Sequence, residues 1–386
     1  MIYLDYAATS PMSSTATDAY RQAAVKFFGN SNSLHDDGSN ASAALESSRK
    51  LIASLAGDVP PQGLHFTGSG SEAVFLTVYG LAMAAKNAGN GTHLITSMAE
   101  HSCVKNSFQW LERHHGFSVT EIPATTAGTV NVDKLKKELR DDTVLVSVQH
   151  VNSETGAINP LQQIGKALEN HPASFHSDCV QSFCKLGLYP GRYNLDAFSI
   201  SAHKISGPKG MGAAYISPKI RWQAFIPESS QEHGFRPGTV DVPAVVSFAA
   251  AAQQMSGERD TNYRSVSATK SRFIHELNRQ RGEHIQIEGD PDQSSPYICG
   301  LRVNGMEGQF AMLQCSQKGL AISTGSACQI NEQKPSATMK AMGYGDEEAK
   351  QFIRFSFGPD TTADEVDQAA NVLSTILKNH LEHVKL

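Results

Sequence analysis

The amino-acid sequence predicts an α/β protein that has a large domain with a mixed, mostly parallel sheet and a smaller α+β domain. From about residue 45 to 217, short apolar runs alternate with stretches of helical periodicity, which is typical of a parallel sheet covered on both faces. After about residue 282 the chain instead offers several short strand patterns and one closing helix. A chain of 386 residues, 40% of them hydrophobic, can bury a core in each domain.

The expected strands of the large domain follow one another before the first long loop. They are the runs LHFT, HLITS, TVLVSVQHV, SFHSDCV, DAFSISAH and GAAYIS. A helix is expected over SEAVFLTVYGLAMAAKNAG, directly after the first run. The segment 218–245 contains PESSQEHGFRPGTVDVP, whose proline, glycine and serine residues indicate a long loop of the kind that carries function.

A helical stretch is expected over residues 243–281, before the smaller domain begins its strands. The strand candidates there are HIQIEG, YICGLRV, LAISTG and IRFSFG, and the closing helix is TADEVDQAANVLSTILKNHLEHVK. We place the large domain at residues 12–250 and the small domain at residues 1–11 together with 251–386.

Composition and charge exclude several classes of function. The 38 acidic and 33 basic residues are mixed along the chain, so no basic stripe is available for nucleic acid. The opening MIYLDYAATSPM has no basic leader pattern, and no run of 18 apolar residues suggests a membrane span. The cysteines lack the CxxC spacing of a metal site, which favours reduced thiols in a cytoplasm. These cysteines are Cys103, Cys179, Cys184, Cys299, Cys315 and Cys328, and we expect all but the last to be small core residues.

The stretch GSGSEA lies between an expected strand and an expected helix. Backbone amides near Gly70 and Ser71, together with the helix N-terminus, would therefore face a bound anion. The stretch also matches GxGxxA, but the acidic residue that a dinucleotide site has about 20 positions later is missing. A small phosphate group fits better, and an ordinary glycine turn is the alternative.

Asp178 and Lys204 each follow a buried strand pattern, at the sheet edge where α/β proteins bind ligands. A carboxylate there needs a cationic partner, such as a protonated pyridine nitrogen, unless Asp178 is simply a helix N-cap. A desolvated lysine loses proton affinity and can react with an aldehyde, whereas an isolated lysine would more often reach out to water. Together with the hydroxyl of Ser201, the imidazole of His203 and the GSGSEA loop, these groups suit pyridoxal phosphate (PLP).

Two further residues bear on the reaction. Cys328 in STGSACQINEQKP is expected on an exposed, mobile loop, where a thiol is a liability unless it is used; a structural cysteine is the alternative. Arg354 in IRFSFG can grip the carboxylate of an amino-acid substrate through two parallel hydrogen bonds, although an ordinary ion pair would explain it equally well.

These motifs in series resemble the NifS/IscS-type cysteine desulfurases, which belong to the class V aminotransferase group of fold type I PLP enzymes. The resemblance spans essentially the whole chain. It rests on YLDYAATSPM, FGNSNSLHDDG, FTGSGSEA, AEHSCV, HVNSETGAINP, HSDCVQSFCKLGL, SAHKISGPKGMGAAYI, FRPGTVDVPA, STGSACQ and IRFSFG, in the order of the family.

The resemblance implies a PLP-dependent conversion of L-cysteine to L-alanine, with a persulfide on Cys328 and sulfur passed to an acceptor for iron-sulfur or other thio-cofactor assembly. It also implies a homodimer. Thr239 of each subunit would reach the cofactor phosphate bound in the neighbouring subunit. The other implied roles are covalent attachment for Lys204, ring-nitrogen pairing for Asp178, a bond to the phenolic oxygen for Gln181, ring stacking and proton transfer for His101, phosphate binding for Gly70, Ser71, Ser201 and His203, and carboxylate binding for Arg354.

The chain departs from the family where two asparagines are usual before Glu-x-Gly. It has Asn152 and Ser153 there, so either residue could make the usual contact with the cofactor ring. Other readings are a selenocysteine lyase or an aminotransferase of the same fold, and a non-catalytic scaffold for sulfur trafficking. The combination of Lys204, Asp178 and Cys328 favours the desulfurase.

Overall fold

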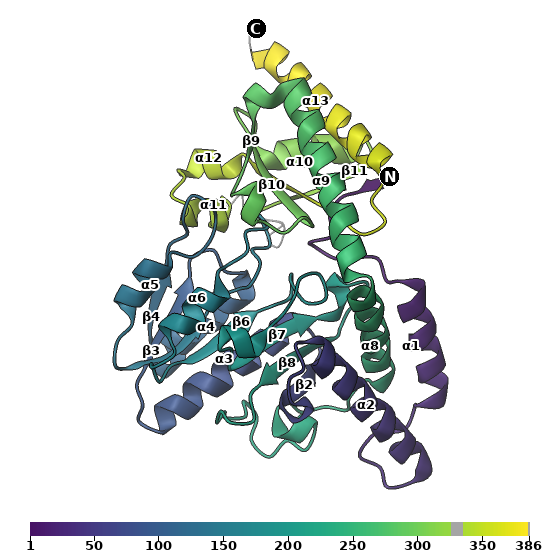
Figure 1. The fold of residues 1–386 in the computed structure, drawn as a ribbon, viewed down its shortest axis with the longest axis vertical. Coiled ribbons are helices and arrows are strands. Elements are labelled where there is room, and N and C mark those ends of the chain that lie inside the picture. The colour runs from purple at the N-terminus through teal and green to yellow at the C-terminus, as the bar shows by residue number, and fades with distance from the viewer. Residues whose placement is uncertain (326–334, 385–386) are drawn as a thin grey trace.

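The computed structural model describes residues 1–325 and 335–384. The strands of its largest sheet are β2 Leu64–Thr67, β3 His93–Ser97, β4 Ser118–Ile122, β5 Thr143–Ser147, β6 Ser174–Asp178, β7 Ala197–Ser201 and β8 Gly212–Ile216. Within the described residues these strands lie in the order β2-β8-β7-β6-β5-β3-β4, with helices on both faces (Figure 1). The predicted α/β fold class is confirmed.

The directions of the strands explain why this sheet is mixed. β4, β3, β5, β6 and β7 run parallel to one another, whereas β8 is antiparallel to both β7 and β2. Ten residues, 202–211, join β7 to β8, and a parallel crossover needs a dozen or more. The sequence analysis missed β4, because this edge strand reads SVTEI and stays largely half-exposed.

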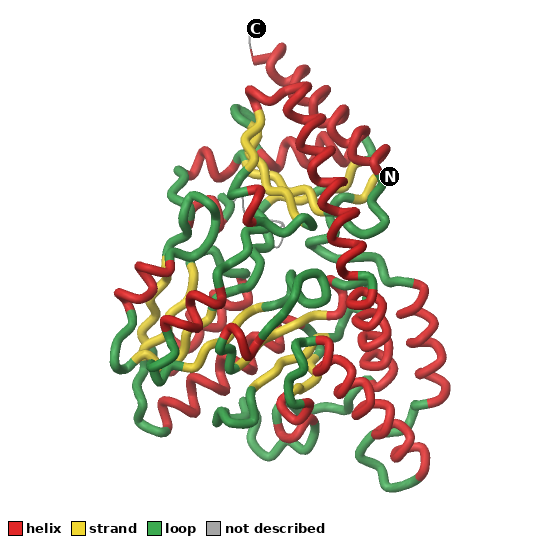
Figure 2. The backbone as a smooth tube through the Cα atoms, in the orientation of Figure 1, coloured by secondary structure: helices red, strands yellow, loops and turns green. Residues whose placement is uncertain are grey.

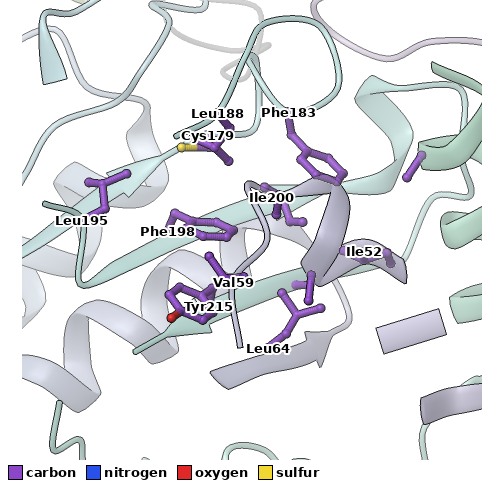
Figure 3. Packing of buried hydrophobic residues seen from close by; sticks show 14 of the residues in the cluster. Ile52, Val59, Leu64, Cys179, Phe183, Leu188, Leu195, Phe198, Ile200 and Tyr215 are labelled. Atoms are coloured by element: carbon purple, nitrogen blue, oxygen red, sulfur yellow. The ribbon is translucent and has the colours of Figure 1, made fainter. Parts of the chain in front are cut away.

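Helices cover the two faces of the large sheet. Their bounds are α1 Ser14–Lys26, α2 Asp36–Leu55, α3 Gly70–Asn87, α4 Ser102–His115, α5 Val132–Glu138, α6 Leu161–Ala167, α7 Pro190–Tyr193 and α8 Val242–Gly257. One hydrophobic cluster joins α3 and α4 to the sheet, and another joins α2 and α8 to it. On β7, Phe198 and Ile200 belong to the second cluster (Figure 3), while Ala197 belongs to the first. A strand buried on both faces is expected to read as a continuous apolar run.

A second body lies at the top of Figure 1. Its strands are β1 Ile2–Tyr3, β9 Ile285–Ile287, β10 Ile298–Val303, β11 Leu320–Ala321, β12 Ser323–Thr324 and β13 Phe352–Ser356. Its helices are α9 Arg259–Arg281, α10 Gly308–Gln317, α11 Ala337–Ala341, α12 Asp346–Lys350 and α13 Ala363–Val384. An antiparallel sheet in the order β12-β13-β10-β9 shares a separate hydrophobic cluster with α9 and α13.

The N-terminal strand β1 pairs with β11, so the chain starts in this second body before it enters the large one. The helical stretch expected over 243–281 is two helices, α8 and α9, that meet at Glu258 (Figure 2). The domain limits at 12–250 and at 1–11 with 251–386 stay a prediction. No helix in the described part of the chain is long and apolar enough to cross a membrane.

Candidate active site

The anion corner lies where β2 leads into α3. Ser69 is the N-cap of α3, and its Oγ accepts a hydrogen bond from Glu72 N at 3.0 Å. Gly70 follows it, and a Cβ at Gly70 would lie 3.0 Å from both Ser201 Cβ and Val180 Cγ2. Glycine therefore lets the start of α3 approach the ends of β6 and β7. The free amides and dipole of this 18-residue helix favour an anion at that point.

A cavity of about 300 Å³ opens beside this corner. It is lined by Ala8, Thr9, Ser69, Ser201, His203, Lys209, Gly210 and Met211. Ser201 Oγ is buried and has no hydrogen-bond partner among the described residues. His203 Nδ1 lies 3.1 Å from Thr9 Oγ1, and burial lowers the pKa of His203 to about 4. The cavity therefore presents an unpaired hydroxyl and a neutral imidazole.

Asp178 ends β6, at the same sheet edge as the end of the adjacent parallel strand β7. The residue is 7% exposed, and its Oδ1 accepts a hydrogen bond from Val180 N at 2.9 Å. Burial raises the pKa of Asp178, while the charges of His101 and Lys204 oppose the rise. A cationic ring nitrogen beside this carboxylate would offset its desolvation.

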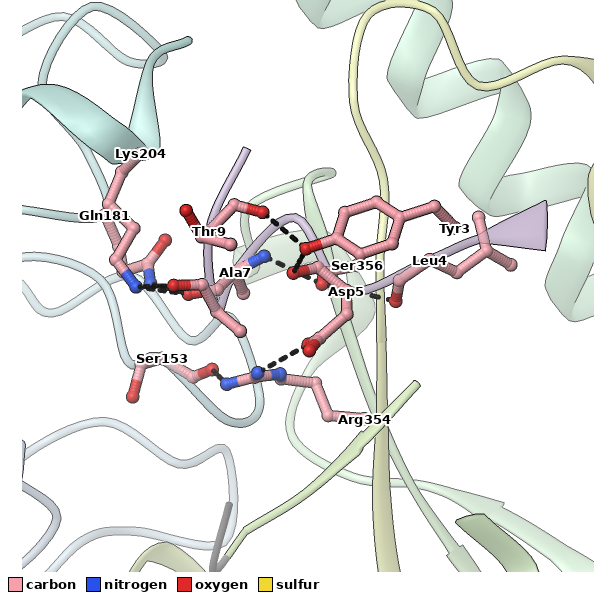
Figure 4. Close-up of polar contacts among 11 residues, drawn as sticks. Tyr3, Leu4, Asp5, Ala7, Thr9, Ser153, Gln181, Lys204, Arg354 and Ser356 are labelled. Carbon is pink, nitrogen blue, oxygen red and sulfur yellow. Dashed lines mark hydrogen bonds and ion pairs between the residues drawn. The ribbon is translucent and has the colours of Figure 1, made fainter. Parts of the chain in front are cut away.

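The amine of Lys204 is held by the opening segment of the chain, and the residue is partly buried. The residue ends the short 3-10 turn Ala202–Lys204 that follows β7, and its Nζ donates to Ala7 O at 2.6 Å and Ala8 O at 2.8 Å. Gln181 Nε2 donates to the same Ala7 carbonyl at 2.9 Å, so the opening segment joins both side chains (Figure 4). Gln181 Oε1 is buried without a hydrogen-bond partner in the described part of the chain.

His101 caps the N-terminus of α4, beside Asp178. Its Nδ1 accepts a hydrogen bond from Cys103 N at 3.2 Å and lies 3.0 Å from Cys103 Sγ. Burial lowers the pKa of His101; the charge of Asp178 opposes this, and those of Lys204 and Arg354 add to it. A backbone N–H can only donate, so Nδ1 is the acceptor nitrogen and the proton of neutral His101 sits on Nε2.

The cysteines divide into two groups. Cys179, Cys184, Cys299 and Cys315 are buried, as predicted. Cys103 corrects the prediction, because it is only partly buried and lies against His101. Burial raises the pKa of Cys103, so its sulfur is a thiol. Cys328 lies outside the described residues.

Arg354 on β13 joins the opening segment to the large body. Its Nη2 lies 2.9 Å from Asp5 Oδ1, and its Nη1 donates to Ser153 O at 2.8 Å (Figure 4). The ion pair that we considered as an alternative therefore exists. Arg354 Nε is buried and has no hydrogen-bond partner among the residues described, which leaves one donor for another acceptor.

Asn152 is occupied by its own loop. Its Nδ2 donates to Ala99 O and to Thr338 Oγ1, both at 3.1 Å, and its Oδ1 accepts from the backbone amides of Glu154 and Thr155. Both amide hydrogens are thus in use, so a contact with a cofactor ring would require one of these bonds to be exchanged. That contact stays a prediction for Asn152 and for Ser153.

The structure brings most of the predicted residues to one sheet edge, but not all of them. Thr239 is exposed and does not line the cavity. The carbonyls of Ala7 and Ala8, the hydroxyl of Thr9 and the side chain of Lys209 belong to the site, although the sequence analysis gave them no role. The motifs YLDYAATSPM and GPKG contain these residues and could have pointed to them. A backbone carbonyl is present in every residue, however, so the residue type does not reveal that it will accept a hydrogen bond in the site.

These residues fit PLP on three independent features. The unpaired Ser201 hydroxyl and the start of α3 match a phosphate, the Asp178 carboxylate matches a pyridinium nitrogen, and the amine of Lys204 matches an aldehyde. The unpaired Oε1 of Gln181 marks a further polar group that faces no protein partner in the described residues. An α/β fold with this set at the carboxyl ends of its strands defines a PLP-dependent enzyme of the aminotransferase kind.

Comparison with known proteins gives the family. Residues 2–369 match the model of the class-V aminotransferase family. A relative from Halalkalibacterium halodurans, assigned as a cysteine desulfurase NifS, is 42% identical over 98% of both chains. The cysteine desulfurase IscS of Rickettsia typhi is 36% identical over 96% of this chain and 90% of its own. A solved NifS-like protein superimposes with a TM-score of 0.90 at 26% identity, over 98% of this chain and 99% of that chain.

The chain therefore belongs to the class-V aminotransferase family and, within it, to the NifS/IscS-type cysteine desulfurases, which are PLP-dependent enzymes. The resemblance found in the sequence motifs is confirmed.

Proposed function

We propose that this chain is a PLP-dependent cysteine desulfurase that converts L-cysteine to L-alanine and forms a persulfide on Cys328. The observation that carries the proposal is the position of Lys204. Its amine is held by the Ala7 and Ala8 carbonyls at the sheet edge that also holds Asp178, next to a cavity with an unpaired Ser201 hydroxyl. Membership in a family of cysteine desulfurases supports cysteine as the substrate.

The residues that would hold the cofactor follow from the site. Gly70, Ser71, Ser201 and His203 would bind its phosphate at the start of α3, and Lys204 would attach to its aldehyde. Asp178 would pair with the ring nitrogen, Gln181 would bind the phenolic oxygen, and His101 would lie against the ring. When bound, PLP supplies an aldehyde that captures the amino group of the substrate and a ring that withdraws electrons from Cα.

The chain's own groups then have separate tasks. Arg354 would bind the substrate carboxylate through its unpaired Nε and the rest of its guanidinium. Lys204 would remove the Cα proton, and the carbonyls of Ala7 and Ala8 would hold the ammonium that results. His101, with its proton on Nε2, would manage the proton of the substrate thiol.

The sulfur step belongs to Cys328. Its thiolate would attack the sulfur of the substrate, so that a sulfur–sulfur bond forms while the carbon–sulfur bond breaks. The electron pair of the broken bond stays with the carbon, which takes up a proton to give alanine. The persulfide would then be handed to a sulfur-acceptor protein for iron-sulfur cluster or other thio-cofactor assembly.

The proposed context is a homodimer in a cytoplasm. The exposed position of Thr239, away from the cavity of its own chain, supports the idea that it reaches the phosphate of a neighbouring subunit.

Borohydride reduction followed by mass spectrometry tests the assignment of Lys204. The cofactor should be linked to residue 204 in the wild-type protein and to no residue in Lys204→Ala. In an assay with a thiol reductant, which releases sulfide from a persulfide, the variant Cys328→Ala should keep the visible absorbance of the bound cofactor but release no sulfide from cysteine. Cys315→Ala is the control: it removes a buried thiol that does not line the cavity, and it should keep sulfide release. Unchanged sulfide release from Cys328→Ala would disprove the persulfide step.

A further inference from the structure

Glu154 lies at the junction of the two bodies. It follows Asn152 in the loop after β5, and its own N–H donates to Asn152 Oδ1 at 2.9 Å. Its carboxylate leaves this loop and accepts a hydrogen bond from Ser336 Oγ, which belongs to the second body. Ser336 is the N-cap of α11, and the same hydroxyl accepts from Met339 N at 3.0 Å. The hydroxyl therefore donates to Glu154 and accepts from the first turn of the helix.

Gly325 lies against the same carboxylate. A Cβ at this position would be 2.8 Å from Glu154 Oε2 and 2.7 Å from Ser336 Cβ. Such distances are too short for a real side chain, so only glycine fits without displacing the contact. Gly325 and Ser336 thus meet at one carboxylate although eleven positions separate them in the sequence.

Two further groups interact with the Glu154 carboxylate, Thr338 of α11 and Arg354 of β13. Thr338 hydrogen-bonds to the carboxylate, and its hydroxyl also accepts from Asn152 Nδ2 at 3.1 Å. Burial raises the pKa of Glu154, while the bonds from Ser336 and Thr338 and the positive charge of Arg354 oppose the rise. The charged groups that face Glu154 therefore include Arg354, which itself bonds to the neighbouring Ser153 carbonyl.

The position of Gly325 limits where Cys328 can reach. Gly325 is the last described residue before the catalytic thiol, and three positions separate the two in the sequence. Glu154 belongs to the loop that contains Asn152 and Ser153, at the candidate active site.

We propose that Glu154 is a positioning residue for Cys328: with Ser336 and Gly325 it anchors the chain before and after the catalytic thiol to the active-site loop. This inference rests on the proposed function, since it assumes that Cys328 carries the persulfide. In this role Glu154 contacts neither substrate nor cofactor. It acts by holding the chain at Gly325 and Ser336, before and after the thiol.

The test uses the full-length protein loaded with PLP and three variants, Glu154→Ala, Glu154→Gln and Gly325→Ala. Single-turnover persulfide formation from cysteine should fall about tenfold in Glu154→Ala, which loses a charge-assisted hydrogen bond. Glu154→Gln should recover most of the rate, because its amide carbonyl can still accept from Ser336. Gly325→Ala should resemble Glu154→Ala. The cysteine concentration that half-saturates the cofactor's spectral change should stay at the wild-type value in all three.

Glu288→Gln is the matched control. Glu288 is a buried carboxylate of the second body that lies outside the candidate active site, and it accepts from Arg302 Nε at 3.0 Å and Tyr344 OH at 2.9 Å. Its loss should lower stability but leave the persulfide rate within about twofold of wild type. If Glu154→Ala and Gly325→Ala also keep the wild-type rate, the anchor does not exist.

A second measurement separates this inference from the proposed function. The rate at which iodoacetamide alkylates Cys328, followed by mass spectrometry without cysteine present, should change in Glu154→Ala and Gly325→Ala and not in Glu288→Gln. If the wild-type protein forms no persulfide on Cys328 but the alkylation rates differ as expected, the proposed function fails and the anchor holds. Equal alkylation rates in all variants would overturn the anchor.

Discussion

Arg354 Nη2 lies 2.9 Å from Asp5 Oδ1, across 349 positions of the sequence. This pair brings the opening segment of the chain to the guanidinium that we assign to the substrate carboxylate. Asp5→Asn should raise the KM for cysteine about tenfold and change kcat less, because the guanidinium loses the charge that orients it. Steady-state kinetics measure this split. An unchanged KM would mean that Ser153 alone orients Arg354.

Ser201 carries a buried hydroxyl without a protein partner in the described residues, so its removal should not weaken the folded chain. We expect Ser201→Ala to raise the dissociation constant for PLP about fivefold while leaving the unfolding free energy of the cofactor-free protein unchanged. Ser199→Ala is the opposite case, since Ser199 Oγ lies 3.0 Å from His176 Nε2. It should lower the unfolding free energy by about 1 kcal/mol and leave PLP affinity unchanged. Titration and urea unfolding distinguish the two patterns.

His101 should set the acid limb of the kcat/KM profile. Burial lowers its pKa below the ordinary value of 6.5, so the imidazole is neutral at pH 7 and the rate should fall only as the pH drops through that lowered pKa. Arg354→Gln removes a cation that lowers the pKa of His101, so the midpoint of the acid limb should move to higher pH. Asp178→Asn removes an anion that raises it, so the midpoint should move to lower pH. Midpoints that stay fixed in both variants would assign the limb to another group.

Lys185 should make stability depend on pH in the cofactor-free protein. The residue is 4% exposed, its Nζ lies 5.4 Å from the centre of the Tyr297 ring, and burial lowers its pKa to about 7. In the unfolded chain the pKa returns to about 10.4. Between these values the unfolded chain binds a proton that the folded chain does not, so the unfolding free energy should rise with pH across that window.

The variant Lys185→Met should remove this rise and should be more stable than wild type at pH 7. Urea unfolding at pH 7 and pH 9 measures the effect. The exposed Lys219, changed to methionine, serves as the control and should keep the wild-type dependence. A Lys185→Met protein with the wild-type pH dependence would contradict the assignment.

Local pattern was enough to predict much of the fold. The apolar runs that became β2, β3, β5, β6, β7 and β8 are buried on both faces, so their signal is strong. The edge strand β4 was missed because only its last residue is buried. Ser118 is exposed and the three residues after it are only partly buried, so the strand has no strong apolar pattern. The break at Glu258 was missed although Gly257, the last residue of α8, is a residue type that favours a helix end.

The placement of Asp178, Ser201 and Lys204 at one edge was also determined by the sequence. Asp178 ends β6, Ser201 ends β7 and Lys204 follows β7, and the carboxyl ends of adjacent parallel strands must meet at the same edge of a sheet. Gly70 and Ser71 follow the same logic, because the turn from β2 into α3 is local.

Only the tertiary structure decided what surrounds these groups. The Ala7 and Ala8 carbonyls that hold Lys204, the Asp5 carboxylate on Arg354 and the Glu154 carboxylate between Gly325 and Ser336 come from segments far apart in the chain. Backbone acceptors are the same for every residue type, and a carboxylate does not reveal in the sequence which cation or hydroxyl it will meet. Such partners are chosen by the packing of the two bodies against each other, which the order of residues alone does not display.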